Sequence, residues 1–257
     1  MACSFCGKSE KSREHIYSNS ILEVFKNEAP LTIDPIRKKV HQGDPIIRDL
    51  CCTCNSKMSY LDSYAGTFFS NYGKVIHSTG TSFNLKSELL AKWCVKTASN
   101  MERWHNRNRL WWKDFKGAFL DEKILLDSSR ISVFLAAWQN KSPIPQGGVL
   151  EGHSIRVLDF VDANVKFCNS VQSGKDEPDH LYSLKVGSFV FLVCIWGEGK
   201  DKSFLLEELK EYGWEILNAD FVSIKKIPFN IWTSDMIGMI HDPSKIYLNG
   251  KLVDIPS

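Results

Sequence analysis

Two cysteine-rich stretches with the same spacing, CSFCG at residues 3–7 and CCTCN at residues 51–55, dominate the first part of the chain. Each contains a C-x-x-C motif; the four cysteines concerned are Cys3, Cys6, Cys51 and Cys54. Where thiols stay reduced, two such pairs are typical of a tetrahedral zinc site, since a two-residue spacer lets both thiolates of a pair reach one ion. Gly7 suits the tight turn with positive φ that such pairs favour. The sequence therefore predicts a structural Zn²⁺ ion.

The alternative interpretation of these cysteines is a redox dithiol with bystander thiols. Redox C-x-x-C motifs occur singly beside a βαβ unit, which the sequence does not show. Cys52 fits the two-residue spacing less well than its neighbours and is left out of the ligand set. The remaining cysteines, Cys94, Cys168 and Cys194, are isolated from one another in the sequence, and we expect them to be small core residues.

Length and composition exclude several classes of protein. A chain of 257 residues, 43% hydrophobic and 24% charged, is typical of a globular protein with one large domain or two smaller ones. The longest apolar run, around Ser188–Trp196, is far shorter than the roughly 20 residues that a membrane-spanning helix needs. The first eight residues have no apolar core of a signal peptide. We therefore expect a cytoplasmic protein with no membrane association.

Charge is unevenly divided along the chain. Residues 1–117 carry 18 Lys and Arg against 11 Asp and Glu, a net charge of +7, whereas residues 118–257 carry 14 against 19, a net charge of −5. This division favours a polyanion partner for the first half. An uneven surface charge without a function is the alternative.

The residues between and after the cysteine pairs resemble a known family. REHI at residues 13–16 follows the first pair, CNSKMSYLD at residues 54–62 follows the second, and LAKWCVKTA occupies residues 90–98. This order is similar to that of the HNH endonuclease superfamily, in the branch that reads CxxC…EH…CxxCN. The resemblance covers roughly residues 1–105. It implies a ββα-metal nuclease module that a four-cysteine zinc site supports.

The resemblance also implies roles for particular residues. His15 matches the general base, which takes a proton from the attacking water, while Glu14 and Asn55 match the ligands of a catalytic Mg²⁺ or Mn²⁺ ion. Asp44 or Asp49 stands where the superfamily has a middle Asn. Asp62 shares a helix face with Asn55 and is either a further ligand or a carboxylate without a catalytic role. The implied function is hydrolysis of phosphodiester bonds in nucleic acid, expected to be DNA, as used in anti-phage defence.

The resemblance and the pattern of apolar residues together predict an α+β protein with three regions. These are the nuclease module (residues 1–75), a helical extension (76–142) and a mainly-β region (143–257), which starts near Pro143–Gly148. Apolar residues with helical spacing predict a helix after Asn55, a second capped by Ser82 or Asn84, and a third over Ser132–Asn140. Strands are expected at Ser154–Leu158, Leu181–Val186, Ser188–Trp196 and Phe221–Ile227, and a short helix at Lys202–Tyr212.

Arginine and tryptophan alternate in residues 101–113. Arg103, Arg107, Arg109 and Lys113 are candidates for contacts with backbone phosphates, and the tryptophans for stacking on bases. The alternative is a helix whose tryptophans are core and whose arginines are solvated.

The rival to the whole nuclease interpretation is a catalytically inactive zinc-ribbon module that binds nucleic acid or protein. Residues 143–257 contain no recognisable motif; they could bind a protein partner or a second copy of the chain.

Overall fold

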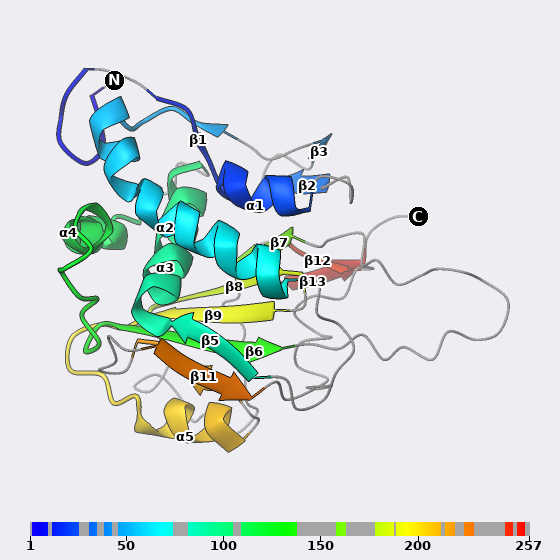
Figure 1. The fold of residues 1–257 in the computed structure, drawn as a ribbon. Helices are drawn as coiled ribbons and strands as arrows, with labels where there is room; N and C mark the ends of the chain where they lie inside the picture. Colours follow the sequence, from blue (N-terminus) through cyan, green and yellow to red (C-terminus); the bar gives the residue numbers. More distant parts are fainter. Residues whose placement is uncertain are drawn as a thin grey trace, which may run out of the picture.

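A computed structural model shows a mixed α+β protein, in which helices pack on both sides of an antiparallel sheet (Figure 1). The structure describes residues 2–9, 12–25, 31–34, 39–42, 46–73, 82–104, 109–137, 158–162, 178–187, 189–211, 214–218, 224–228, 245–248 and 251–254. Its helices are α1 (Asn19–Val24), α2 (Cys52–Tyr72), α3 (Ser87–Trp104), α4 (Lys116–Leu120), α5 (Ser203–Glu211) and the 3-10 helix η2 (Trp111–Phe115). The coarse class expected from the sequence is confirmed.

Within the described residues, the strands pair in one large sheet and four small ribbons. The large sheet has the order β10-β6-β9-β8-β7, and the ribbons pair β1 with β4, β2 with β3, β5 with β11, and β12 with β13. The strands are β1 (Glu14–His15), β2 (Leu31–Asp34), β3 (Lys39–Gln42), β4 (Ile46–Ile47), β5 (Ser82–Lys86), β6 (Ile131–Ala137), β7 (Leu158–Asp162), β8 (His180–Val186), β9 (Phe189–Ile195), β10 (Glu215–Ile216), β11 (Ile224–Pro228), β12 (Lys245–Leu248) and β13 (Lys251–Asp254).

Strand β9 forms the centre of the large sheet, and every residue of its FVFLVCI sequence is buried. Alternate side chains point to opposite faces, so Phe191 and Val193 join the core on one side while Leu192 and Cys194 join that on the other. The second core also contains Leu205 and other residues of α5. Burial on both faces explains why β9 reads as an unbroken apolar run. The predictions of β8, β9 and α5 are confirmed.

Helices α2 and α3 cover the first face of the sheet. The apolar stripe expected in α2 is buried at Met58, Leu61, Ala65 and Phe68 and half-buried at Tyr64, which confirms the helix after Asn55. Helix α3 is buried over nearly its whole length. The rings of Phe69 and Trp93 lie 5.3 Å apart and both pack against Phe191 of β9. The aromatic contacts therefore fix the two helices on the sheet.

Two sequence-based expectations about secondary structure are wrong. Residues 132–140 were expected to be helical, but Ile131–Ala137 form strand β6, which pairs with β9 from Ile131↔Ile195 to Ala137↔Phe189. A run that is apolar on both faces has no helical or strand period, and pairing with a neighbouring strand decides its structure. The second helix begins at Ser87 rather than after Ser82 or Asn84, because Ser82–Lys86 pairs with β11.

Some predictions fall on residues that the structure does not describe. These include the boundary near Pro143–Gly148, Cys168, and all but the last residue of the strand expected at Ser154–Leu158. Cys94 and Cys194 are fully buried, as expected for small core residues. Strand β11 begins at Ile224, within the stretch expected at Phe221–Ile227.

Candidate metal centre and adjoining pocket

The four cysteines that the spacing selected lie together in the structure. One sulfur atom from each of Cys3, Cys6, Cys51 and Cys54 lies within 4.8 Å of the other three, and the Sγ atoms of Cys6 and Cys51 are 3.5 Å apart. Four sulfurs around a zinc ion at about 2.3 Å have similar separations. The cluster could therefore hold a metal ion such as zinc. Cys52 is exposed and does not belong to it.

Backbone hydrogen bonds give each cysteine pair its shape. In the first pair, Gly7 has a φ of 78° and its N–H donates to the Cys3 carbonyl at 2.9 Å. In the second pair, Cys51 is the N-cap of α2, and its sulfur accepts a hydrogen bond from the Cys54 N–H at 3.3 Å. Both hydrogen bonds hold the backbone of a pair in the turn that brings its two sulfur atoms together.

The thiols also influence one another. Burial alone would raise the pKa of Cys3, but N–H groups and a neighbouring thiol donate hydrogen bonds to its sulfur and lower the pKa to about 6. Burial raises the pKa of Cys54, and hydrogen bonds among the thiols raise it further. The pKa values of Cys3 and Cys54 thus shift in opposite directions, as expected of a crowded set of thiols that a cation would stabilise together.

Next to the cysteine cluster, β1 and β4 form a two-residue antiparallel pair that precedes α2. Glu14 lies opposite Ile47, and His15 lies opposite Ile46. The Asn100 side chain of α3 supports β1, since its amide group donates to the carbonyls of His15 at 3.0 Å and Ile16 at 3.2 Å. A fully buried amide therefore connects the short strand to the helical core.

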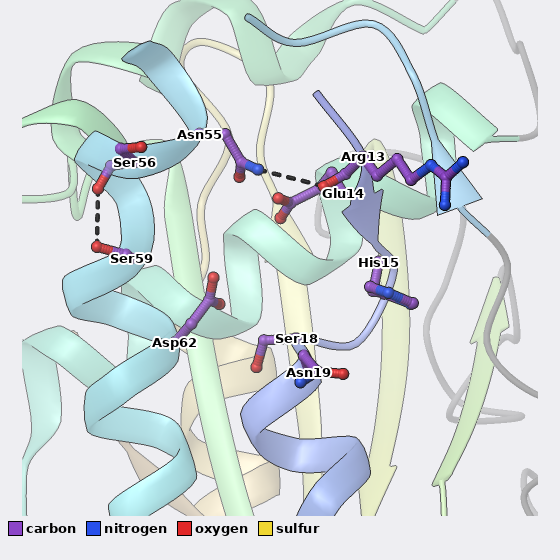
Figure 2. A pocket seen from close by; sticks show the side chains of 9 residues that line it. All are labelled: Arg13, Glu14, His15, Ser18, Asn19, Asn55, Ser56, Ser59 and Asp62. Carbon is purple, nitrogen blue, oxygen red and sulfur yellow. Dashed lines mark hydrogen bonds between the residues drawn. The ribbon is translucent and has the colours of Figure 1, made fainter. Parts of the chain in front are cut away.

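The three residues implied as catalytic by the resemblance line one pocket of about 280 Å³. Its walls come from β1, α1 and α2; the lining residues are Arg13, Glu14, His15, Ser18, Asn19, Asn55, Ser56, Ser59 and Asp62. Figure 2 shows the side chains of Glu14, Asn55 and Asp62 turned toward the space between β1 and α2, whereas the imidazole of His15 points away from α2. Adjacent strand residues face opposite ways, and here both still border the pocket.

A buried ammonium group lies beneath the pocket. Lys96 of α3 is only 2% exposed, and its Nζ lies 2.6 Å from Oε1 of Glu14 and 2.8 Å from both carboxylate oxygens of Asp62. Burial alone would lower the pKa of Lys96, but the carboxylates of Asp62 and Glu14 raise it above its usual value. Burial raises the pKa of Asp62, and Glu14 raises it further, while Lys96 opposes both effects. Lys96 is therefore the positive member of a buried charge triad.

A second buried cation connects the pocket to the cysteine cluster. Arg103 donates to Oδ1 of Asp49 at 2.7 Å and to the Asn100 side-chain oxygen, and Asp49 also accepts from the Ser4 hydroxyl at 2.7 Å. The Arg103 side chain is 3% exposed and lies over the rings of Phe5 and Trp112. The expectation that Arg103 contacts phosphates is wrong, because the fold uses its guanidinium internally.

Other residues of the arginine and tryptophan segment divide between core and surface. Trp111 and Trp112 are buried, as in the core alternative, and Arg109 pairs with Glu102 at 3.5 Å. Lys113 is exposed, and Arg107 lies outside the described residues. Asp44 also lies outside them, while Asp49 serves the cysteine-rich module through Ser4 and Arg103. The described part of this segment is therefore largely structural.

Sequence reasoning missed the roles of Lys96 and Asn100. Lys96 belongs to the LAKWCVKTA motif at residues 90–98, and Asn100 lies just after that motif. One signal was present: a lysine on a largely apolar helix is expected to be buried only with a carboxylate partner. The residues that Lys96 and Asn100 contact could not be predicted from the sequence, because Glu14 and Asn100 are 86 positions apart in the chain.

Comparison of the chain with protein-family models, with curated proteins and with solved structures finds no match. Among the described residues, no helix is both long enough and apolar enough to cross a membrane.

Proposed function

We propose that the chain is a metal-dependent endonuclease of the HNH type that hydrolyses phosphodiester bonds in nucleic acid, with DNA as the expected substrate. The observation that carries the proposal is that Glu14, His15 and Asn55 all line one pocket beside a four-cysteine cluster. Strand β1 supplies Glu14 and His15, and helix α2, which follows the antiparallel partner strand β4, supplies Asn55; this order is compatible with the proposed module. The zinc ion would be structural, since all four of its ligands are cysteines.

In this proposal His15 is the general base. A neutral imidazole at the border of the pocket can take the proton of an attacking water near neutral pH. The backbone carbonyl of His15 is held by Asn100 at 3.0 Å, so the position of β1 relative to α3 is fixed before any substrate binds. Fixing the backbone of the base in this way reduces the rearrangement that proton transfer would require.

Glu14 and Asn55 would hold the catalytic Mg²⁺ or Mn²⁺ ion. The Asn55 side-chain nitrogen donates to the carbonyl of Arg13 at 3.3 Å, so its oxygen is the atom left to coordinate a cation. A carboxylate and an amide oxygen, completed by water, suit a hard divalent ion. When bound, such an ion stabilises negative charge on the scissile phosphate and on the leaving oxygen.

A cleavage assay with a matched histidine control tests the proposal. Zinc-loaded protein is incubated with supercoiled plasmid, linear DNA or RNA, with and without Mg²⁺ or Mn²⁺. His15→Ala should reduce the cleavage rate by about 10²–10⁴ with little change in thermal stability, because a general base contributes to rate and not to packing. His180→Ala, in β8 and outside the pocket lining, should cleave like the unmodified chain. Equal activity in the two variants would locate the base elsewhere.

One observation favours a second candidate, an inactive zinc-ribbon module that binds nucleic acid or protein. Oε1 of Glu14 already lies 2.6 Å from Nζ of Lys96 and accepts a hydrogen bond from Nδ2 of Asn100 at 3.2 Å. The ammonium group of Lys96 therefore neutralises the carboxylate without a metal ion. This candidate predicts nucleic-acid or protein binding that survives His15→Ala and needs no divalent cation. Cation-dependent cleavage that is lost in His15→Ala separates the nuclease from it.

A further inference from the structure

Lys96 and Asn100 approach the same oxygen of Glu14 from one helix. They are four residues apart on α3, which places their side chains on the same face of the helix. Lys96 lies 2.6 Å from Oε1, and Asn100 donates to that atom at 3.2 Å. The two donors occupy Oε1, so Oε2 is the oxygen through which Glu14 would coordinate a cation.

Asp62 also contacts the ammonium group of Lys96. Both of its carboxylate oxygens lie 2.8 Å from Nζ of Lys96, and its side chain is 20% exposed, compared with 6% for Glu14. A lysine this deeply buried is stable as a cation only with such partners. The triad thus joins α2, α3 and β1 through a single charge.

We propose that Lys96 is the positioning residue of the Glu14 carboxylate, and that it occupies the place between Glu14 and Asp62 that a cation would otherwise take. This inference rests on the proposed function, because it concerns the same site. The two carboxylate oxygens of Glu14 therefore have different partners. The fixed ammonium group of Lys96 orients Oε1, and a single divalent ion binds on the side of Oε2 and Asn55. Asp62 then acts through Lys96 and is not a ligand.

Helix α3 offers a matched control. Lys92, one turn earlier than Lys96, is fully buried as well; its Nζ lies 3.8 Å from Glu88 and donates to the carbonyl of Glu122 at 2.9 Å. Lys92 does not line the pocket. Replacing Lys92 or Lys96 by methionine makes the same chemical change at the same depth of burial, so a general loss of packing affects both variants alike.

The experiment measures Mn²⁺ binding and cleavage separately, using the full zinc-loaded chain. Binding is followed by the electron paramagnetic resonance signal of free Mn²⁺, and kcat is measured at saturating plasmid, with both values corrected for the folded fraction. Lys96→Met should tighten Mn²⁺ binding by about tenfold or more, since a repelling charge is removed. The same variant should lower kcat by about 10–100-fold, because Glu14 loses its orientation. Lys92→Met should change neither value.

Opposite changes in binding and kcat are the distinguishing result. General structural damage, or loss of a ligand as in Glu14→Gln, weakens binding and lowers kcat together. The proposal is overturned if Lys96→Met changes neither value, as expected for Lys92→Met. It is also overturned if Lys96→Met weakens binding and lowers kcat together, as expected for Glu14→Gln. If Lys96→Met does not fold, Lys96→Arg tests the proposal instead. The retained charge should keep the Kd for Mn²⁺ within about twofold of the unmodified value, while the larger head group should lower kcat about tenfold or more. Full kcat in Lys96→Arg rejects the positioning role.

The two arms also separate this proposal from the proposed function. If the unmodified chain binds Mn²⁺ through Glu14 but cleaves neither DNA nor RNA, the nuclease assignment fails, and the Kd of Lys96→Met still decides the role of Lys96. If Glu14→Gln binds Mn²⁺ as well as the unmodified chain does, no cation binds beside Glu14, and the role proposed for Lys96 is rejected.

Discussion

Asn100 shows how much one buried side chain can organise. Its amide nitrogen donates to the carbonyls of His15 and Ile16 and to Glu14, and its oxygen accepts from Arg103. Because the residue is fully buried, the carbonyls of His15 and Ile16 would lose this donor, with no water to replace it, if the side chain were removed. Asn100 is therefore the residue through which α3 holds β1.

We predict that Asn100→Ala destabilises the protein by about 2–3 kcal/mol and also reduces cleavage by the folded fraction. Denaturant unfolding gives the first value, and a cleavage assay gives the second. Asn218→Ala is the control, because Asn218 is also buried and connects Val133 to Ile131 far from the pocket. The Asn218→Ala variant should lose a similar amount of stability, but its folded fraction should cleave as fast as the unmodified protein. A loss of activity equal in both variants would mean that Asn100 has only a structural role.

At the scale of elements, the second cysteine pair is also the beginning of a helix. Cys51 caps α2, and the N–H of Asn55 donates to the Cys51 carbonyl at 3.0 Å. A metal ion bound by Cys51 and Cys54 would thus fix the first turn of the helix that supplies Asn55 and Asp62 to the pocket. The metal centre and the candidate active site share this element.

We predict about one tightly bound zinc ion per chain, which elemental analysis can measure. Structural zinc contributes on the order of 10 kcal/mol to folding, so Cys6→Ser should leave the N-terminal part unfolded or the protein insoluble. Cys52→Ser changes an exposed thiol outside the cluster and should keep both the zinc and the stability. Well-folded protein without zinc, or equal zinc loss in both variants, would contradict the assignment.

A glycine allows α1 and α2 to approach closely. A Cβ atom on Gly66 would lie 2.6 Å from Cβ of Ser20, closer than two such atoms can come. Ser20 is held in place by its hydrogen bond to the Asp62 carbonyl at 2.7 Å. The close contact therefore places α1, with Ser18 and Asn19, against the pocket.

We predict that Gly66→Ala destabilises the protein by about 1–3 kcal/mol, because the two helices must move apart. Gly117→Ala in α4 is the matched control, since the nearest atom to its Cβ would be 3.7 Å away. A helical glycine with open space gains about 0.4–1 kcal/mol on replacement by alanine. Thermal unfolding of both variants tests this contrast; a stable Gly66→Ala would mean that the contact is easily relaxed.

At the scale of the whole molecule, one core joins residues from both sides of position 143. Phe68 and Phe69 of α2 lie 5.2 Å and 6.1 Å from Phe189 of β9, measured between ring centroids. Strand β6 pairs along its full length with β9. The described residues therefore give the helices of the first half and the sheet of the second half a shared interior.

We predict that a fragment of residues 1–142 does not fold by itself. Without β8 and β9, the fragment exposes the aromatic face of α2 and α3 and leaves β6 without a partner, which favours aggregation. Circular dichroism and size-exclusion chromatography of the zinc-loaded fragment test this. A soluble fragment with a cooperative unfolding transition would show that the first half is an independent domain.

The sequence by itself determined the features that depend on neighbouring residues. The spacing of the two cysteine pairs, the helical stripe of α2 and the apolar run of β9 all lie within short windows, where spacing and periodicity identify them. Only the tertiary structure decided which residues meet. Ile131–Ala137 became a strand because β9 lies beside it, and Arg103 became internal because Asp49 accepts from it. The triad of Glu14, Lys96 and Asp62 likewise depends on packing. A buried charge needs an oppositely charged partner, and the fold determines which residue lies near it, however distant that residue is in the chain.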